Sequence, residues 1–169
     1  MKYRLLIVAL TILICSATFS QVESLNIAPN VIFIEAAGAG GYGSINYERV
    51  LYKKNFIMST LRFGISTYHI VDYTNNFNPD IIIPFTFNVL YGKSHKIEIG
   101  FGEVYSNIVH ADLIHFKPKR MSHFSTVFSL GYRYQKNKGG LIFRCAYTPI
   151  VEFNKYFRHW GGISFGYSF

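Results

Sequence analysis

Apolar residues stand at every second position over most of this chain. At the C-terminus, Ile163, Phe165, Tyr167 and Phe169 alternate with residues that are all glycine or serine. A period of two is the repeat of a β-strand, whose successive side chains point to opposite faces, whereas an α-helix repeats every 3.6 residues. The same alternation occurs in the segments 31–37, 46–51, 60–65, 83–91, 96–101, 124–135 and 141–147. The pattern predicts an all-β chain.

The connections between these segments are alternately short and long. Short, lysine-bearing turns lie at 52–55, 92–95 and 136–139, and longer polar loops lie at 69–80, 107–121 and 149–158. Short turns at one end and long loops at the other are typical of antiparallel up-and-down barrels of bacterial outer membranes, whose short turns face the periplasm. Pro84 cannot donate to a strand ladder, so we expect the upper part of its strand to be bulged or unpaired.

The number of strands follows from the directions in which they run. If Phe169 ends a strand that runs toward the periplasm, counting back through the loops makes 46–51 run the same way. An exported chain whose N-terminus stays in the periplasm then needs one strand of opposite direction before 46–51. Segment 31–37 supplies that strand, with Gly38, Gly40 and Gly41 in the turn. The total is eight, an even number as bacterial barrels require. A single strand over 31–51 would reduce it to seven.

The N-terminal residues have the features of an export signal. Lys2 and Arg4 precede an apolar core at 5–14, and the small residues Ser16, Ala17 and Ser20 follow it. This core is too short to span a bilayer. We expect a signal peptide at 1–20, a short segment at 21–29 and the barrel at 30–169. No later segment has the apolar run of a transmembrane helix.

Alternation does not say which face meets lipid, because a soluble lipocalin-like barrel alternates as well. Composition decides the question: 18% of the residues are aromatic and only 15% are charged, and the polar face is mostly glycine and serine. The Phe, Tyr and Ile face is too apolar for water and predicts contact with lipid. The lumen then contains seven charged residues: Glu35, Glu48, Arg62, Lys96, Glu98, Arg133 and Arg144. Three acids and four bases nearly cancel, which predicts a salt-bridged plug without an open pore.

Several strand and turn motifs carry a resemblance to a known family. They are INYER at 45–49, VLYGKSH at 89–95, GYRY at 131–134, GGLIFR at 139–144, YTPI at 147–150 and WGGISFGYSF at 160–169. Together they resemble a family of small, largely uncharacterised outer-membrane β-barrel proteins of Bacteroidetes-type bacteria. The resemblance covers about residues 34–169 and implies a barrel in the outer membrane of a Gram-negative cell, without a particular activity. Phe169 with Tyr167 is also similar to the terminal signal that barrel-assembly machinery recognises, although Ser164 replaces the usual glycine.

His123 and Ser125 have the one spacing that suggests catalysis. It is similar to the His-x-Ser motif of outer-membrane lipid A deacylases, in which a histidine base activates a serine and an acid orients the histidine. Thr126 stands where that motif has asparagine, and the first acid downstream is Glu152. Both side chains are expected to face inward, whereas a deacylase must meet lipid from outside. We therefore predict no enzymatic activity and keep lipid A modification as an alternative.

The predicted extracellular end contains residues that could bind ligands. It holds five of the six histidines and three aspartates, namely His69, His110, His115, His123, His159, Asp72, Asp80 and Asp112. Their spacing is not that of a metal site, so no metal or other cofactor is predicted. Lys117, Lys119 and Arg120 form a basic cluster that could either hold lipopolysaccharide phosphates or simply be solvated.

Trp160, Tyr167 and Phe169 are predicted to anchor the barrel at the membrane interfaces, where aromatic rings gather. We expect a monomer, since a closed barrel has no free strand edge. Outer-membrane lipid, lipopolysaccharide and, during insertion, barrel-assembly machinery are the expected partners. Nucleic acid is not, because the basic residues are spread over the turns.

The sequence therefore predicts an all-β, antiparallel, eight-stranded up-and-down transmembrane barrel in the cell outer membrane. Its predicted role is non-enzymatic, in envelope structure or surface interaction. The alternatives are a lipid A-modifying enzyme and a narrow solute channel or transport accessory.

Overall fold

The computed structural model describes residues 27–111, 118–152 and 157–169. The signal peptide expected at 1–20, and most of the short segment expected at 21–29, lie outside these ranges. Within them no helix has both the length and the apolar character needed to cross a membrane. The elements are β1 (Asn30–Ala37), the 3-10 turn η2 (Gly38–Gly40), β2 (Gly43–Lys54), β3 (Ile57–Ser66), β4 (Ile81–Gly92), β5 (His95–Ala111), β6 (Pro118–Gln135), β7 (Gly140–Tyr147), β8 (Ile150–Glu152), β9 (Phe157–Arg158) and β10 (Gly161–Ser168).

The strands form a closed antiparallel barrel. Strands β1 to β7 pair each with the next, β7 pairs with β10, and β10 pairs with β1, so the ring has eight members. Strand β8 pairs with β6 beyond the end of β7, and β9 pairs with β8 before β10 begins. These two short strands therefore extend β7 and β10. The predicted eight-stranded barrel is confirmed, including the first hairpin of β1 and β2.

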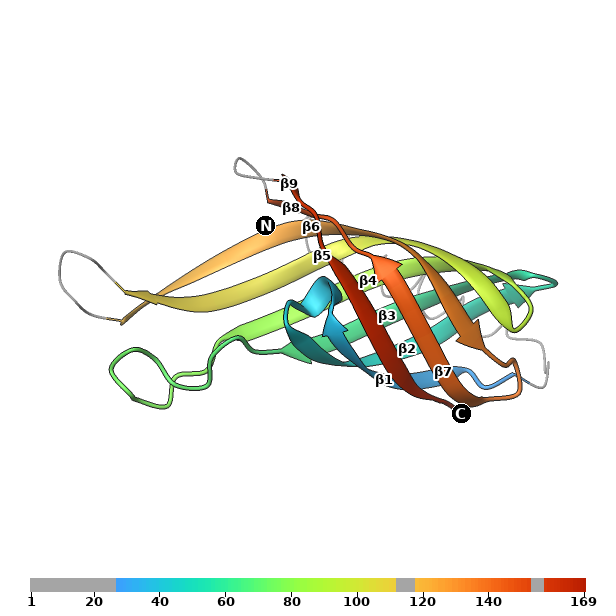
Figure 1. Cartoon of the computed structure of the whole chain (residues 1–169), viewed down its shortest axis with the longest axis horizontal. Helices are drawn as coiled ribbons and strands as arrows, with labels where there is room; N and C mark the ends of the chain where they lie inside the picture. Colours follow the sequence, from blue (N-terminus) through green and yellow to red (C-terminus); the bar gives the residue numbers. More distant parts are fainter. Residues whose placement is uncertain (1–26, 112–117, 153–156) are drawn as a thin grey trace, which may run out of the picture.

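The two ends of the barrel differ in their connections (Figure 1). At the turn end, on the right of the view, tight turns join β2 to β3, β4 to β5 and β6 to β7, and β1 begins where β10 ends. At the loop end, on the left, the segment 67–80 and the long β5–β6 hairpin project beyond the other strands. The distribution of short and long connections matches the sequence expectation.

One predicted loop is mostly strand. Residues 107–121 were expected to form a loop, but β5 runs to Ala111 and β6 starts at Pro118, with paired positions from Asn107↔Ser122 to Ala111↔Pro118. This part of the hairpin lies beyond the other barrel strands, so neither face has an apolar environment and the sequence shows no alternation. Backbone pairing holds the ribbon together, with side-chain hydrogen bonds from Asn107 to Ser122 and from Arg120 to Asn107 across it.

The prediction that the strand of Pro84 is bulged or unpaired in its upper part holds for its pairing with β3 and not for its pairing with β5. Strand β4 pairs with β5 without a break, through Pro84↔Val104. Its pairing with β3 lapses between Phe63↔Phe85 and Ser66↔Ile82, without a change of register. A bulge occurs instead in β2 near the turn end, where the register with β3 shifts between Val50 and Tyr52.

The outer wall is apolar and the interior is polar in the middle. On β10, Phe165 is 57% exposed and its neighbour Ser164 is fully buried. Apolar side chains close the lumen on both sides of its polar middle. Near the loop end they are Ala39, Ile82, Val104 and Val127, and near the turn end they are Val31, Phe33, Ile142, Val50, Met58 and Leu90.

Candidate functional site

Six of the seven charged residues predicted for the lumen are joined in one continuous series of ion pairs. They are fully buried and come from six different strands. We call this series the ion chain, and its order is Arg62, Glu35, Arg144, Glu98, Arg133 and Glu48. Acids and bases alternate along it, so each carboxylate has at least one guanidinium beside it.

Glu35 of β1 joins the first part of the ion chain. Both terminal nitrogens of Arg62 donate to its carboxylate, and Arg144 Nη1 lies 2.6 Å from its Oε1. The Ser164 hydroxyl donates to the same oxygen at 3.3 Å. Arg62 is held in turn by Asn46, whose Oδ1 accepts from Arg62 Nε at 2.9 Å. The Ser44 hydroxyl of β2 donates to the other carboxylate oxygen of Glu35 at 3.5 Å, so five strands meet at one carboxylate.

Glu98 of β5 joins the second part. Its Oε1 accepts a hydrogen bond from Arg144 Nε at 2.8 Å, and its Oε2 lies 2.7 Å from Arg133 Nη2 in an ion pair. Arg133 Nη2 also donates to Glu48 Oε2 at 2.9 Å, and its Nη1 donates to the other oxygen of Glu48. Buried charges are tolerated when they are paired in this way, and removing one partner leaves the other charge buried and unpaired. The ion chain thus ties strands across the lumen.

Lys96 is the seventh charged residue and stands apart from the ion chain. It is buried at the turn end, and its Nζ donates to the backbone carbonyl of Gln135. No carboxylate in the described ranges forms an ion pair with it.

The turn between β1 and β2 folds into the barrel. Gly38, Ala39 and Gly40 are all buried, and Ala39 packs with Ile82 and Val104 from the other side of the lumen. Gly38 has a φ of +81°, and a Cβ placed on it would lie 2.3 Å from Glu35 Cδ. Only glycine fits there. The turn η2 therefore covers the ion chain at the loop end.

The predicted interface anchors lie at opposite ends of the barrel wall. Trp160 directly precedes β10 at the loop end, where its ring is in edge contact with Tyr42 at a centroid distance of 6.2 Å. Tyr167 and Phe169 are half exposed at the turn end. The backbone of Phe169 exchanges two hydrogen bonds with Asn30, which joins the last residue to the start of β1.

Comparison with known proteins bears on the fold. No protein-family model matches the chain, and no curated relative does either. Among solved structures, the chain is similar to the N-terminal β-barrel domain of OprF from Pseudomonas aeruginosa, with 12% sequence identity and a TM-score of 0.57. The match covers 83% of this chain and 95% of the OprF domain. The fold is of the outer-membrane barrel type.

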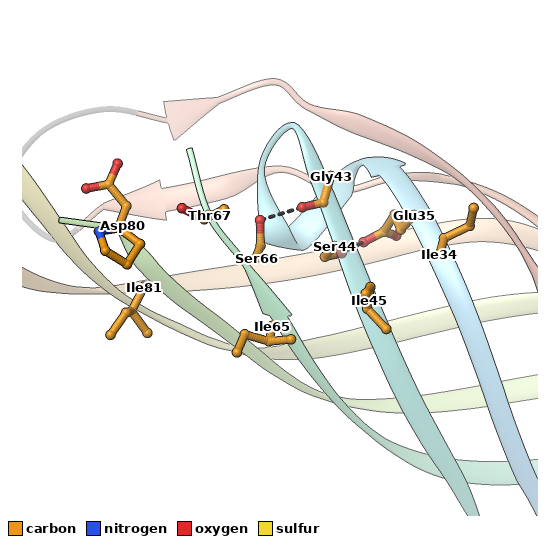
Figure 2. Close-up of a pocket in the computed structure, with 11 residues that line it drawn as sticks. Ile34, Glu35, Gly43, Ser44, Ile45, Ile65, Ser66, Thr67, Asp80 and Ile81 are labelled. Atoms are coloured by element: carbon orange, nitrogen blue, oxygen red, sulfur yellow. Dashed lines mark hydrogen bonds between the residues drawn. The ribbon is translucent and has the colours of Figure 1, made fainter. Parts of the chain in front are cut away.

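A groove of about 590 Å³ lies on the outer wall at the loop end (Figure 2). Its outward lining consists of Ile34, Ile45, Ile65 and Ile81. The groove lies where pairing between β3 and β4 lapses, and the Ser66 hydroxyl there donates to the Gly43 carbonyl. Its polar side chains are thus bonded within the wall, and it presents no group set up for catalysis.

The His-x-Ser pair lies on β6 near the loop end. Ser125 is buried and His123 is half-buried. The register places Glu152 of β8 directly opposite Ser125. The two residues are far apart in the sequence, which gave no sign that they are neighbours. No hydrogen bond joins these three side chains in the part of the chain that the structure describes, and Glu152 Oε1 lies 3.6 Å from Arg158 Nη2.

Two histidines of the loop end share a pocket, and His159 lies apart from them. His69 Nδ1 lies 3.0 Å from Asp80 Oδ2, and His110 lines the same pocket of about 380 Å³. His159 lies elsewhere, with its Nδ1 2.6 Å from the Tyr147 hydroxyl. His115 and Asp112 lie outside the described residues. Within those residues, no three His, Cys, Asp or Glu side chains are grouped to hold a metal.

Arg120, from the predicted basic cluster, is engaged in the fold. It donates to Asn107 Oδ1 at 2.6 Å, to Asn78 Oδ1, and to the Pro79 carbonyl at 2.9 Å. The bonds to Asn78 and Pro79 tie the β5–β6 hairpin to the segment 67–80, and the bond to Asn107 lies within the hairpin. Lys119 is exposed, and Lys117 lies outside the described ranges.

Proposed function

We propose that this protein is a non-enzymatic integral outer-membrane barrel of a Gram-negative, Bacteroidetes-type bacterium. Its lumen is plugged, and its role is in envelope structure or in surface contact through the loop end. Lipid and lipopolysaccharide surround it, and barrel-assembly machinery inserts it.

The observation that supports this proposal best is the apolar outer wall. Large hydrophobic side chains are more than half exposed around the whole circumference. Examples are Ile34 on β1, Ile45 on β2, Ile99 on β5, Leu130 on β6 and Phe165 on β10. A continuous apolar surface of this kind is unfavourable in water and suits acyl chains. Aromatic rings at both ends, Trp160 and Tyr167 among them, suit the membrane–water interfaces.

The interior supports a structural role over a conduit. The charged side chains of the ion chain are bound to one another, and apolar clusters with η2 lie on either side of them. An eight-stranded barrel has only enough internal width for side chains. A continuous aqueous path is therefore not expected.

The loop end supports surface contact. Arg120 fixes the projecting hairpin to segment 67–80, and Asp72 accepts hydrogen bonds from Thr74, Asn76 and Asn78 within that segment. These bonds make an ordered extracellular platform on which a partner could dock. The exposed Lys119 is available there for lipopolysaccharide phosphate.

Membrane fractionation with gel migration before and after boiling tests the proposal. A folded barrel in the outer-membrane fraction shifts its apparent mass on boiling. Recovery in the soluble fraction, or no shift, would contradict it. Ile99→Arg adds a charge to the outer wall and should cost about 2–4 kcal/mol of folding into vesicles if that side chain lies at the bilayer midplane. Met121→Arg, on the projecting hairpin, is the control and should insert normally.

Lipid A modification is kept as a second candidate because Glu152 lies opposite Ser125. We expect the lipid A mass spectrum to be unchanged when Ser125→Ala replaces the wild type in cells. Ser129→Ala is the matched control, since Ser129 is also buried on β6. A lipid A species that disappears only with Ser125→Ala would favour the enzyme.

A further inference from the structure

Among the residues that the structure describes, two lysines at the turn end of the lumen have no acidic partner. Lys96 is 1% exposed, and its Nζ donates to a backbone carbonyl. Lys53 Nζ is shielded from solvent and has no hydrogen-bond partner among the residues that the structure describes. The buried glutamates, Glu35, Glu48 and Glu98, are all engaged by arginines. The two ammonium groups are thus not neutralised by any of the buried glutamates.

The bulge in β2 places Lys53 inside. Before the bulge, the even-numbered residues of β2 face inward, as Glu48 and Val50 do. The extra residue at the bulge reverses this order, and Lys53 pairs with the buried Met58 while Lys54 pairs with the exposed Ile57. Paired residues of antiparallel strands share a face. Without the bulge, Lys53 would point outward and Lys54 inward.

The electrostatics of this region favour an anion. Lys53 and Lys96 both face the turn end of the lumen and are shielded from solvent, so their like charges repel each other. Burying two like charges without a counter-ion is costly. The neighbouring turns add the exposed Lys54, Lys93 and Lys136, and no acidic side chain stands in the turns 55–56, 93–94 or 136–139. The whole turn end is therefore complementary to a negatively charged group.

We propose that Lys53 and Lys96 bind a phosphate group at the turn end of the lumen. Their ammonium groups can donate charge-assisted hydrogen bonds to its oxygens. The exposed lysines of the turns attract it to the entrance. In the proposed membrane orientation the turn end lies at the inner leaflet, so the group is either a phospholipid headgroup or free inorganic phosphate.

The first experiment uses inorganic phosphate on the whole chain folded in a zwitterionic detergent without phosphate. Thermal unfolding is compared in phosphate and in chloride at equal pH and ionic strength. At several times the dissociation constant, phosphate should raise the midpoint by about 2–4 °C for a protein of this size. Lys53→Met and Lys96→Met should abolish the difference, and Lys54→Met should keep it. Equal midpoints of the wild type in both salts, together with no lipid preference in the second experiment, would overturn the site.

The second experiment separates the two sources of phosphate. Native mass spectrometry measures retention of phosphatidylglycerol against a galactosyl diacylglycerol with the same chains and no phosphate. Preferential retention by the wild type, lost in Lys53→Met and kept in Lys54→Met, identifies the headgroup. Stabilisation by inorganic phosphate without lipid preference identifies the free ion. Retention or stabilisation that is the same in Lys53→Met as in the wild type would overturn the proposal, even if Lys96→Met does not fold.

This inference goes beyond the proposed function and is tested separately from it. The detergent measurement does not depend on where the protein resides in the cell. A soluble location would contradict the membrane proposal and leave the phosphate result to be judged on its own.

Discussion

Arg133 on β6 and Arg144 on β7 lie directly opposite each other in the barrel wall, and both are buried. Like charges in that relationship repel and destabilise a sheet. Glu98 resolves the conflict from β5, with one carboxylate oxygen 2.8 Å from Arg144 Nε and the other 2.7 Å from Arg133 Nη2. Its register partner on β6 is Gly131, where a Cβ would lie 2.5 Å from the Cβ of Ala146 on β7.

Glu98→Gln should therefore destabilise the barrel strongly. The amide removes the negative charge between two buried guanidiniums, and loss of one partner of a buried pair costs about 3–5 kcal/mol. Urea unfolding in detergent or in vesicles measures the loss. Glu103→Gln, on the exposed face of the same strand, is the matched control and should change stability by less than about 1 kcal/mol.

A double variant tests whether charge is the cause. Glu98→Gln with Arg144→Met leaves Arg62 with Glu35 and Arg133 with Glu48, so the remaining pairs are complete. The double variant should lose less stability than the sum of its single changes. Strict additivity would show that Glu98 acts through packing instead.

Gly38→Ala should displace η2 from the lumen or strain it. The added Cβ would lie 2.3 Å from Glu35 Cδ, at a φ of +81°. Gly140 also has a positive φ, and a Cβ there would meet nothing within 4 Å. Gly38→Ala should thus cost about 1–3 kcal/mol more than Gly140→Ala in urea unfolding, because overpacking adds to the backbone penalty that both share. Equal losses of stability in the two variants would show that η2 accommodates the added methyl group without overpacking.

Purified wild-type protein should give no large, stable conductance steps in planar bilayers. The reason is the ion chain, which occupies the polar middle of the lumen between apolar clusters. A porin recorded under the same conditions is the positive control. Stable large steps would refute the plugged lumen and favour the channel alternative.

Arg120→Met should release segment 67–80 from the β5–β6 hairpin. It removes the bonds to Asn107, Asn78 and Pro79. Charged hydrogen bonds of this kind support local order, so proteinase K should cleave the segment about tenfold faster. Lys119→Met, at the exposed neighbouring position, should leave the rate near that of the wild type. No difference between the two variants would show that Arg120 is not what holds the segment.

Segment 67–80 should lose order in strong acid. Hydrogen bonds from Thr74 and Asn78 lower the pKa of Asp72 from its ordinary 3.8 to about 2. A lowered pKa means that the stabilising effect is fully present above the ordinary value and is lost as the pH falls through about 2. Amide shifts of Thr74 and Asn76 should follow this titration. In Asp72→Asn the same amides should not respond over that range, and a response there would assign the effect to another group.

Much of the barrel could be predicted because alternation is a local property. The inward positions of Glu35, Glu48 and Arg133 follow from the two-residue period of each strand, whatever the strand pairs with. The pairing of the charges could not be predicted in this way. Arg144 and Glu35 are 109 residues apart and meet because β7 and β1 both flank β10.

Other features of the site also had no signal in the sequence. The bulge that turns Lys53 inward changes the register at one residue, and the sequence around it reads as an ordinary strand end. Glu152 lies opposite Ser125 only because β8 continues along β6. The glycines at 38, 40 and 41 predict a tight turn, but not that it folds into the lumen.

The sequence by itself determined the strands, their number and the side of the wall on which most residues lie, since these depend on backbone geometry over a few neighbouring residues. Only the tertiary structure decided which charges pair, where the wall bulges and what closes each end. These features depend on closing the ring, which brings distant strands into one register and leaves each buried charge only the partners within its reach.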